Sequence, residues 1–221
     1  MKITVNVAMT LDGKIDTVIR RGAKISSDSD WERVDKLRAE SDAILVGGRT
    51  LLDEDPRLNI KSTKLREGRI ARGVEPDPVK VGVVSVSTLS ANSRFLTEGA
   101  GKIIIFTTQR TSAKQLAFLR EMGAVVFVLG KKRVDLRTAM DVLEEFGIEN
   151  LMVEGGGAII AALLAEDLVD EIRAYIAPLI FGGATAPTLA DGMGFPEAII
   201  LDLISVEQVE DGGILAKYEV L

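Results

Sequence analysis

The stretch Leu151–Leu164, LMVEGGGAIIAALL, reads as a short strand, an acidic residue at its end, three glycines and an almost wholly apolar helix. Glycines at a strand-to-helix turn let the backbone approach a phosphate closely, and the helix N-terminus offers unpaired N–H groups with a partial positive charge. Glu154 would place a carboxylate at the carboxyl edge of a sheet, where open α/β sheets bind their ligands. The stretch therefore indicates an α/β fold, with a nucleotide-cofactor site at the turn as its functional interpretation.

The three glycines could instead form a tight turn that only allows close helix–strand packing. The motif does not decide between this interpretation and a cofactor site. The dinucleotide fingerprint G-x-G-x-x-G fits Gly155 and Gly157 but fails at Ile160. A second strand–glycine–helix turn follows an apolar run at Gly47-Gly48. There Thr50 would sit in the first helical turn, either as an ordinary cap or as a ligand to a phosphate.

Composition narrows the chemistry. The 221 residues contain no cysteine and no histidine, which excludes disulfides, thiolate nucleophiles, Ser-His-Asp triads and zinc sites built on these side chains. The catalytic groups that remain possible are carboxylates, lysines, hydroxyls, a hard metal ion and a bound cofactor. Hydride transfer fits this set, because the cofactor supplies the reactivity and the protein positions it. We therefore expect a cofactor-dependent reaction and no metal site.

Charge and hydropathy bear on partners and location. The net charge of −6 argues against non-specific binding of nucleic acid. The N-terminal run MKITVNVAMTLDGK has polar residues within its apolar pattern and no small-residue cleavage site, so we interpret it as a first strand rather than a signal peptide. No apolar run reaches membrane-spanning length. The expected location is the cytoplasm, without a membrane partner.

Periodicity and turn signals predict the remaining elements. Helices are expected after the capping residues Ser27, Ser112 and Asp135. Strands are expected at Lys2–Thr10, Ala43–Val46, Lys80–Val86, Lys102–Thr107, Ala124–Leu129, Val169–Ile176, Ile199–Glu207 and Gly213–Val220. The last two lack an intervening helix, which favours an antiparallel hairpin at one sheet edge. The fold class is α/β, a three-layer sandwich with a mostly parallel central sheet and antiparallel C-terminal strands, in one domain over residues 1–221.

Two segments carry charges whose roles are open at this point. In the helix after Ser27, the residues Trp31, Val34 and Leu37 mark the buried face, and Arg38 lies just off it as a solvated charge. The segment Lys61–Pro78 carries five basic residues and no clear period. It is most simply an exposed, mobile loop, and its functional interpretation is the binding of an anionic group.

Taken together, the motifs resemble one family over nearly the whole chain. The blocks NVAMTLDGKI, KISSDSDWERVDKLRAESDAILVGGRTLLDEDPRL, LMVEGGG, LVDEIRAYIAPLIFGG and APTLADGMGF occur in the same order in archaeal 2,5-diamino-6-ribosylamino-4(3H)-pyrimidinone 5′-phosphate reductases of riboflavin biosynthesis. Those enzymes are similar to the reductase half of the bacterial bifunctional deaminase/reductase and share the dihydrofolate reductase-like fold. The resemblance implies NADPH-dependent reduction of the ribosyl side chain of this phosphorylated pyrimidine to the ribityl form, in a homodimer, with NADH as a possible second cofactor.

The resemblance also implies roles for individual residues. The catalytic residues would be Lys14, near the carbonyl end, and Glu154. The substrate would meet Arg38, Leu58, Lys61 and Glu154. The cofactor would contact Thr50, Glu54, Val84, Ser85, Val134, Gly156, Gly157, Pro178, Leu179, Ile180 and Phe181. Glu54 stands where relatives commonly carry Asp, and the run VGVVSVS before Thr88 lacks the Asp that they carry.

Two other functions fit the same residues. One is a dihydrofolate or pterin-type reductase on the same fold, which an assay with a pterin would distinguish. The other is a sensor that binds NADPH without turnover, against which the presence of both Lys14 and Glu154 weighs.

Overall fold

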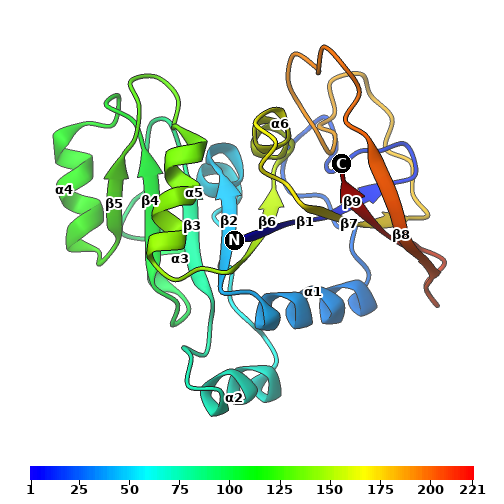
Figure 1. Ribbon diagram of the computed structural model, residues 1–221, viewed down its shortest axis with the longest axis horizontal. Coiled ribbons are helices and arrows are strands. Elements are labelled where there is room, and N and C mark those ends of the chain that lie inside the picture. Colours follow the sequence, from blue (N-terminus) through cyan, green and yellow to red (C-terminus); the bar gives the residue numbers. More distant parts are fainter. The chain divides into compact units, whose positions relative to one another are not determined.

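The protein is described by a computed structural model that covers residues 1–221, and its chain forms two compact units (Figure 1). The first unit comprises Met1 and Asp35–Met152, and the second comprises Lys2–Val34 and Val153–Leu221. The chain passes from one unit to the other within helix α1 (Asp28–Glu40) and again within strand β6 (Asn150–Gly155). That both act as the single domain expected from the sequence stays a prediction.

The first unit is built on four parallel strands. They are β2 (Ala43–Gly47), β3 (Val79–Val83), β4 (Ile103–Thr107) and β5 (Val125–Val128), in the order β5-β4-β3-β2. Every residue of β2 and of β4 is buried, as expected for apolar runs without alternation in a parallel sheet covered on both faces. Because the strands are parallel, their carboxyl ends lie at one edge, where the turns of this unit gather.

Short helices connect these strands. They are the π-helical turn η1 (Thr50–Glu54), α2 (Thr63–Ala71), α3 (Arg94–Thr97), α4 (Ala113–Glu121) and α5 (Leu136–Glu145). Ser112 accepts a hydrogen bond from the backbone N–H of Gln115 at 3.2 Å, and Asp135 accepts one from that of Thr138 at 3.0 Å. Both are N-caps, so the predicted starts of α4 and α5 are confirmed.

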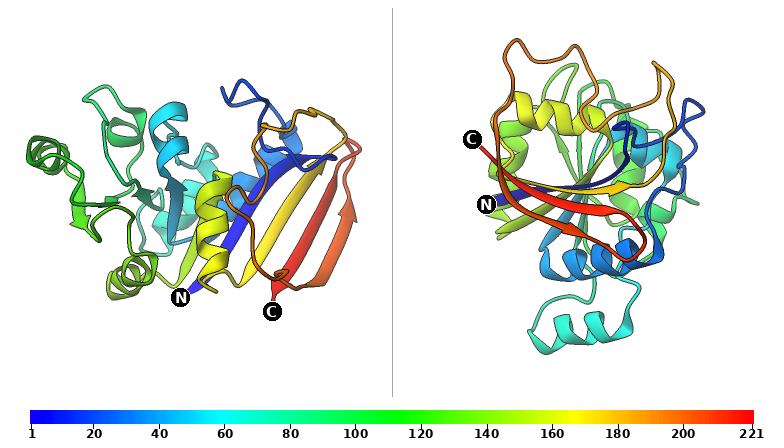
Figure 2. Two further views of the ribbon diagram at one scale, coloured as in Figure 1. Left: turned by 90° about the horizontal axis from the view of Figure 1, so that it is seen from above. Right: turned by 90° about the vertical axis from the view of Figure 1, so that its right-hand side faces the viewer.

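The second unit places β1 (Lys2–Thr10) beside β7 (Glu171–Ala177) in parallel, and then β9 (Ile214–Val220) and β8 (Leu201–Gln208) in antiparallel pairing. Figure 2 shows these four strands side by side, with β8 at the outer edge. Helix α6 (Gly157–Ala165) follows β6. The predicted α/β class with mostly parallel strands and an antiparallel C-terminal pair is confirmed. No helix in the chain is both long enough and apolar enough to cross a bilayer.

Helix α1 buries a different face from the predicted one. Val34 is buried as expected, but Trp31 is 40% exposed, and Arg38, expected to be solvated, is buried. Its Nη1 atom donates to the backbone oxygen of Asn59 at 2.9 Å. Buried polar side chains need such partners, and a distant stretch of backbone supplies this one. Helical periodicity cannot reveal a partner of that kind.

The expectation of a mobile loop at Lys61–Pro78 was wrong, because helix α2 lies within it. Arg69 of α2 is only 5% exposed. Its guanidinium donates to the backbone oxygens of Ala39 (3.0 Å), Ser41 (2.8 Å) and Glu75 (2.8 Å). The first two oxygens lie at the C-terminal end of α1, where carbonyls lack helical partners. A cation at that end also meets the negative pole of the helix.

We expect Arg69→Met to lower the free energy of unfolding by about 3 kcal/mol, because the apolar side chain leaves buried carbonyls without donors. The measurement is a urea unfolding curve. Lys64→Met, on an exposed position of the same helix, is the matched control and should change stability by less than about 0.5 kcal/mol. Equal effects of the two substitutions would show that Arg69 does not anchor α2.

Glu171 is the centre of a charged cluster in the second unit. Its carboxylate is nearly fully buried and accepts hydrogen bonds from Lys2 (2.8 Å), Lys217 (3.1 Å) and Arg173. Burial by itself raises the pKa of this carboxyl, but the hydrogen bonds from the three cations outweigh burial and lower the pKa from 4.5 to about 2. The pKa in the folded protein is thus below that in the unfolded chain.

The charged Glu171 therefore stabilises the fold above about pH 4.5, and this contribution disappears as the pH falls toward 2. Solvent screens the exposed ammonium groups of Lys2 and Lys217, which weakens their effect. We therefore expect Glu171→Gln to lower the free energy of unfolding by about 2 kcal/mol at pH 7 and by close to nothing at pH 2. Unfolding curves at several pH values measure this. The exposed neighbour Glu219→Gln is the control. A cost that is the same at pH 7 and pH 2 would contradict the account.

Candidate functional site

The glycine turn after β6 is held by a distant loop of the second unit. Gly155 has φ +98°, and Gly156 is the extended N-cap of α6. A Cβ atom on Gly157 would lie 2.2 Å from the backbone oxygen of Thr188, so only glycine fits there. The backbone N–H of Asp191 donates to the carbonyl of Gly157 at 3.1 Å. The turn therefore packs closely, as one interpretation expects, and the first N–H groups of α6 have no side-chain cap. That the turn binds a cofactor stays a prediction.

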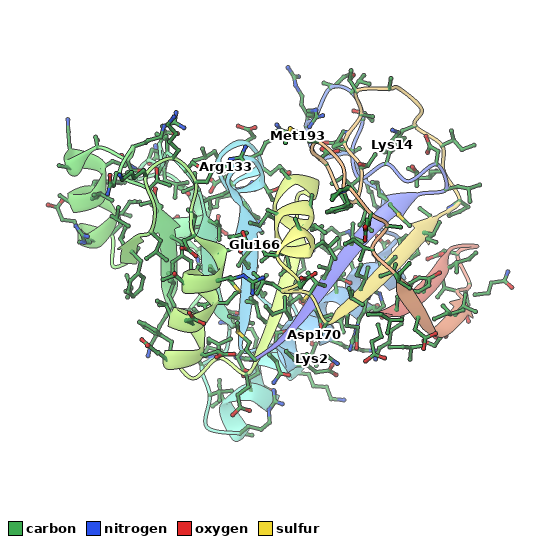
Figure 3. The ribbon with its side chains drawn as sticks, turned by 45° about the horizontal axis from the view of Figure 1, so that its top comes forward. Lys2, Lys14, Arg133, Glu166, Asp170 and Met193 are labelled. Carbon is green, nitrogen blue, oxygen red and sulfur yellow. The ribbon has the colours of Figure 1, made fainter.

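Lys14 lies against the same loop. Its backbone N–H donates to Oγ1 of Thr10 at 3.0 Å, and its carbonyl accepts from the N–H of Thr10 at 2.9 Å. Lys14 and Thr188 also form an isolated antiparallel bridge. Figure 3 shows Lys14 on the loop that follows β1. Because Thr188 contacts both Lys14 and Gly157, the structure brings two of the predicted site residues to one segment of chain.

Asp12 organises the other half of this region, a role that the sequence did not predict. Its carboxylate accepts hydrogen bonds from Thr10 Oγ1 (2.5 Å) and from the backbone N–H groups of Gly182 (2.7 Å) and Phe181 (3.2 Å). The hydrogen bond from Thr10, with those from the two backbone groups, lowers the pKa of this exposed carboxyl. The N–H of Leu11 also donates to the oxygen of Leu179 at 2.9 Å. The LDGK turn therefore fixes the predicted cofactor segment Pro178–Phe181.

In the first unit, α1 fixes the segment that carries the predicted substrate residues. The carboxylate of Asp35 accepts hydrogen bonds from the backbone N–H groups of Lys61 and Ser62, each at 2.7 Å. Together with the bond from Arg38 to Asn59, these contacts bring Arg38 and Lys61 to the same stretch of backbone. Leu58 is buried and has φ +49°, so its side chain belongs to the core. Asp35 was missed because its partners are backbone groups about 26 residues away.

The turn after β2 carries Thr50 and Glu54. As predicted, Thr50 lies in the first helical turn, directly after the N-cap residue Arg49. The next residue after η1, Asp55, accepts hydrogen bonds from Ser93 Oγ (2.6 Å) and the N–H groups of Arg94 (2.7 Å) and Phe95 (3.0 Å). Although burial raises the pKa of the Asp55 carboxyl, these bonds lower it overall. The turn is thereby fixed to the start of α3.

The turns after β3, β4 and β5 contact one another at the carboxyl edge of the sheet. Val84 is buried, and the carbonyl of Ser85 accepts a hydrogen bond from Thr108 Oγ1 at 2.6 Å. The N–H of Gln109 donates to the carbonyl of Gly130 at 3.2 Å. Val134 follows in the same connection, directly before the N-cap of α5. The hydroxyl of Thr108, which fixes this arrangement, was missed because serine and threonine are common in any turn.

The contacts group the predicted site residues into separate sets, some in the second unit and some in the first. In the second unit, Lys14 and Gly157 meet at Thr188, and Asp12 fixes the segment Pro178–Phe181. In the first unit, α1 fixes Lys61, and the turns after the parallel strands carry the remaining predicted cofactor residues. Glu154 is half-buried, two residues before the N-cap of α6. Within these sets the positions fit a ligand at the carboxyl ends of strands, and the roles of the individual residues stay predictions. No group of three or more acidic side chains is arranged to hold a metal ion.

Comparison with known proteins gives consistent matches over nearly the whole chain. The profile of the RibD C-terminal domain matches residues 1–215. The chain is 40% identical over 212 residues to the 2,5-diamino-6-ribosylamino-4(3H)-pyrimidinone 5′-phosphate reductase of Archaeoglobus fulgidus, covering 95% of this chain and 94% of that protein. It is 40% identical over 205 residues to the protein of the same name from Methanothermobacter thermautotrophicus, covering 93% and 89%.

A solved structure has the same fold. The crystal structure of a pyrimidine reductase-like protein from Corynebacterium diphtheriae superimposes with a TM-score of 0.84 at 20% sequence identity, covering 100% of this chain and 92% of that one.

Proposed function

Because the chain belongs to the family of the RibD C-terminal domain, we propose that it is the reductase that converts 2,5-diamino-6-ribosylamino-4(3H)-pyrimidinone 5′-phosphate to its ribityl form, with NADPH as cofactor. The observation that carries this proposal is the 40% identity to two archaeal proteins of that name, each matched over nearly its own full length. The same matches favour the riboflavin branch over a pterin reductase.

The assay that tests the proposal follows the loss of NADPH absorbance with two substrates, the diamino compound and its deaminated counterpart. Turnover of the diamino compound is the expected result, and turnover of that compound alone would also fix the order of reduction and deamination. Turnover of the deaminated compound alone would retain the chemistry and contradict the proposed substrate.

When bound, the cofactor would supply a hydride to C1′ of the ribosyl group, and the residues around it would have to stabilise the negative charge that results. Because C1′ keeps its bond to the amine nitrogen, the C1′–O4′ bond breaks, and the ring oxygen leaves with the electron pair as an alkoxide and then takes a proton. In this proposal the ammonium group of Lys14 stabilises the alkoxide and donates that proton. Glu154 either accepts hydrogen bonds from substrate hydroxyls and amines or orients Lys14. The support for these roles is that Lys14 and Gly157 both lie against Thr188.

The phosphate of the substrate would meet the segment that α1 fixes. Lys61 is exposed, and its ammonium group suits a phosphate as a point charge. Arg38 is buried and already donates to the backbone of Asn59. In this proposal Arg38 acts mainly by holding that segment in place, and Leu58 supports it from the core. Thr50, Glu54, Ser85, Val134 and the glycine turn would contact the cofactor.

We also propose that the protein forms a homodimer through β8. All eight residues of this edge strand are exposed, and they include four large apolar side chains: Leu201, Leu203, Ile204 and Val206. An exposed apolar edge strand invites pairing with another chain, and a contiguous exposed apolar patch marks an interaction surface. A second copy of the chain presents the same edge, so two copies can pair their β8 strands and cover each other's apolar side chains symmetrically.

Val206→Lys should therefore convert a dimer into monomers at micromolar concentration, because Val206 is 62% exposed on this strand and a charge would be buried without a partner. Light scattering on a sizing column measures the molar mass. Glu207→Gln on the same strand is the control and should leave the dimer intact. A monomeric unsubstituted protein, or a Val206→Lys variant that stays dimeric, would contradict this interface. The cytoplasmic location stays a prediction.

A further inference from the structure

Two loops of the second unit, residues 16–23 and residues 183–191, lie against each other. The pairing begins where the N–H of Ile15 donates to the oxygen of Pro187 at 3.0 Å. This bond is directly beside the bridge that pairs Lys14 with the second loop. The position of the first loop therefore bears directly on Lys14.

Asp16 gives the first loop an order of its own. Its buried carboxylate accepts hydrogen bonds from the backbone N–H groups of Thr17 (2.7 Å), Gly22 (2.9 Å) and Ala23 (2.9 Å). Asx side chains commonly order turns in this way. Because one side chain binds both ends of the loop, the residues between them are held as one compact body, and a contact made by any of them positions the whole loop.

Arg20 makes such a contact with the second loop. Its Nη2 atom donates to the backbone oxygen of Thr185 at 2.8 Å, and its Nη1 atom lies 3.9 Å from Oδ2 of Asp191. The other carboxylate oxygen of Asp191 accepts from the N–H and from Oγ1 of Thr188, each at 3.0 Å. The N–H of Asp191 donates to the oxygen of Gly157. Arg20 therefore contacts the residue that holds the second loop to the glycine turn.

The backbone of Arg20 indicates that the position requires its side chain. Its φ of +55° lies in the left-handed region, which favours glycine because a Cβ atom crowds the backbone there. The same loop has a glycine at its other such position, Gly22, with φ +74°. An arginine in this conformation is unfavourable by itself, so the contacts of its guanidinium must offset the strain.

We propose that Arg20 is a positioning residue for the reaction, which holds residues 16–23 against residues 183–191 and so keeps Lys14 in place beside the glycine turn. The inference rests on the proposed function, in which Lys14 donates the proton to the leaving oxygen. A proton donor must lie within hydrogen-bond distance of the atom that it protonates, so a small displacement slows turnover. The partners of Arg20, Thr185 and Asp191, have no predicted contact with the cofactor, so its effect reaches the reaction through Lys14.

Arg20→Met tests this inference, because methionine keeps the Cβ atom and the apolar stem, and with them the backbone strain, while it removes both contacts. We expect kcat to fall by about 10-fold, with the affinity for NADPH in calorimetry changed by less than about twofold. Arg20→Lys keeps a cation that can reach one acceptor and should recover part of the loss. Arg21→Met, at an exposed position of the same loop, is the matched control and should leave kcat within about twofold.

A double-mutant cycle with Lys14 separates positioning from a merely structural role. If Arg20 acts through Lys14, Arg20→Met should change kcat by less than about twofold once Lys14 is already methionine. A role in stability alone would lower kcat equally in both backgrounds, or would lower the unfolding midpoint in urea with kcat unchanged. Either of these results would overturn the inference.

Amide hydrogen exchange tests the link between the loops without turnover. In Arg20→Met the N–H of Ile15, which donates to the second loop, should exchange at least about 10-fold faster, and in Arg21→Met it should exchange as in the unsubstituted protein. Unchanged exchange together with unchanged kcat in Arg20→Met would overturn the inference and leave the proposed function standing. If the unsubstituted protein did not oxidise NADPH with the diamino substrate, the proposed function would fall and the inference with it.

Discussion

Lys14→Met should lower kcat for reduction of the diamino substrate by about 10²–10⁴-fold, the usual contribution of a positioned proton donor. Methionine keeps the length and apolar stem of the side chain but cannot donate a proton or stabilise an alkoxide. Affinity for the cofactor should change little, because Lys14 acts on the oxygen of the substrate. Steady-state kinetics with NADPH and calorimetric binding of NADPH measure the two effects separately.

The structure makes this substitution a clean test. The backbone of Lys14 is fixed by the side chain of Thr10 and by the bridge to Thr188, and neither contact uses the ammonium group. Lys24→Met is the control, since Lys24 lies farther along the same connection and makes only an exposed ion pair with Asp28. Its kcat should stay within about twofold of the unsubstituted value. A Lys14→Met enzyme with full turnover would remove Lys14 from the chemistry.

Gly157→Ala should reduce the free energy of unfolding by about 3 kcal/mol, the upper end of the usual cost of overpacking. The added methyl group would lie 2.2 Å from the backbone oxygen of Thr188 and 3.1 Å from the backbone nitrogen of Asp191. Backbone atoms cannot swing aside as a flexible side chain can, so the loop must move. Because Thr188 also pairs with Lys14, the same shift should lower kcat.

Gly68→Ala is the matched control for this substitution. Gly68 lies in helix α2, and a Cβ atom there meets nothing within 4 Å. Alanine is the better helix former, so we expect a gain of about 0.5–1 kcal/mol. Urea unfolding compares the two variants. A Gly157→Ala protein as stable as the unsubstituted one would show that the contact with Thr188 does not constrain the turn.

The parts of the fold that could be predicted from the sequence are those set by local rules. Ser112 and Asp135 cap the helices that they were expected to cap, because a cap depends on residues three positions apart. The antiparallel pairing of β8 and β9 followed from the absence of a helix between them. The predicted strand positions agree with the structure to within a few residues at their ends.

The errors have a common physical cause. Arg38 and Arg69 were assigned to solvent because charged side chains usually lie there. Both are buried, because backbone carbonyls that are distant along the chain accept their hydrogen bonds. Trp31 was assigned to the core from its place in a helical period, yet it is 40% exposed. Local periodicity does not specify which backbone groups a folded chain brings to a helix.

The candidate site shows the same limit. Family resemblance gave Lys14, Glu154 and the glycine turn as site residues, and the structure places Lys14 and Gly157 against one loop. The residues that hold this region in position were not predicted. Asp12 fixes the segment that includes Phe181 through two backbone N–H groups about 170 residues away. Asx side chains in turns often bind backbone groups, but nothing in the sequence identified these partners.

The most direct test of the account is to incubate the purified protein with NADPH and 2,5-diamino-6-ribosylamino-4(3H)-pyrimidinone 5′-phosphate, following absorbance and the mass of the product. The account predicts that one NADPH is oxidised for each substrate consumed, giving a product with two more hydrogen atoms. Bound NADPH without oxidation, or oxidation without this product, would contradict it.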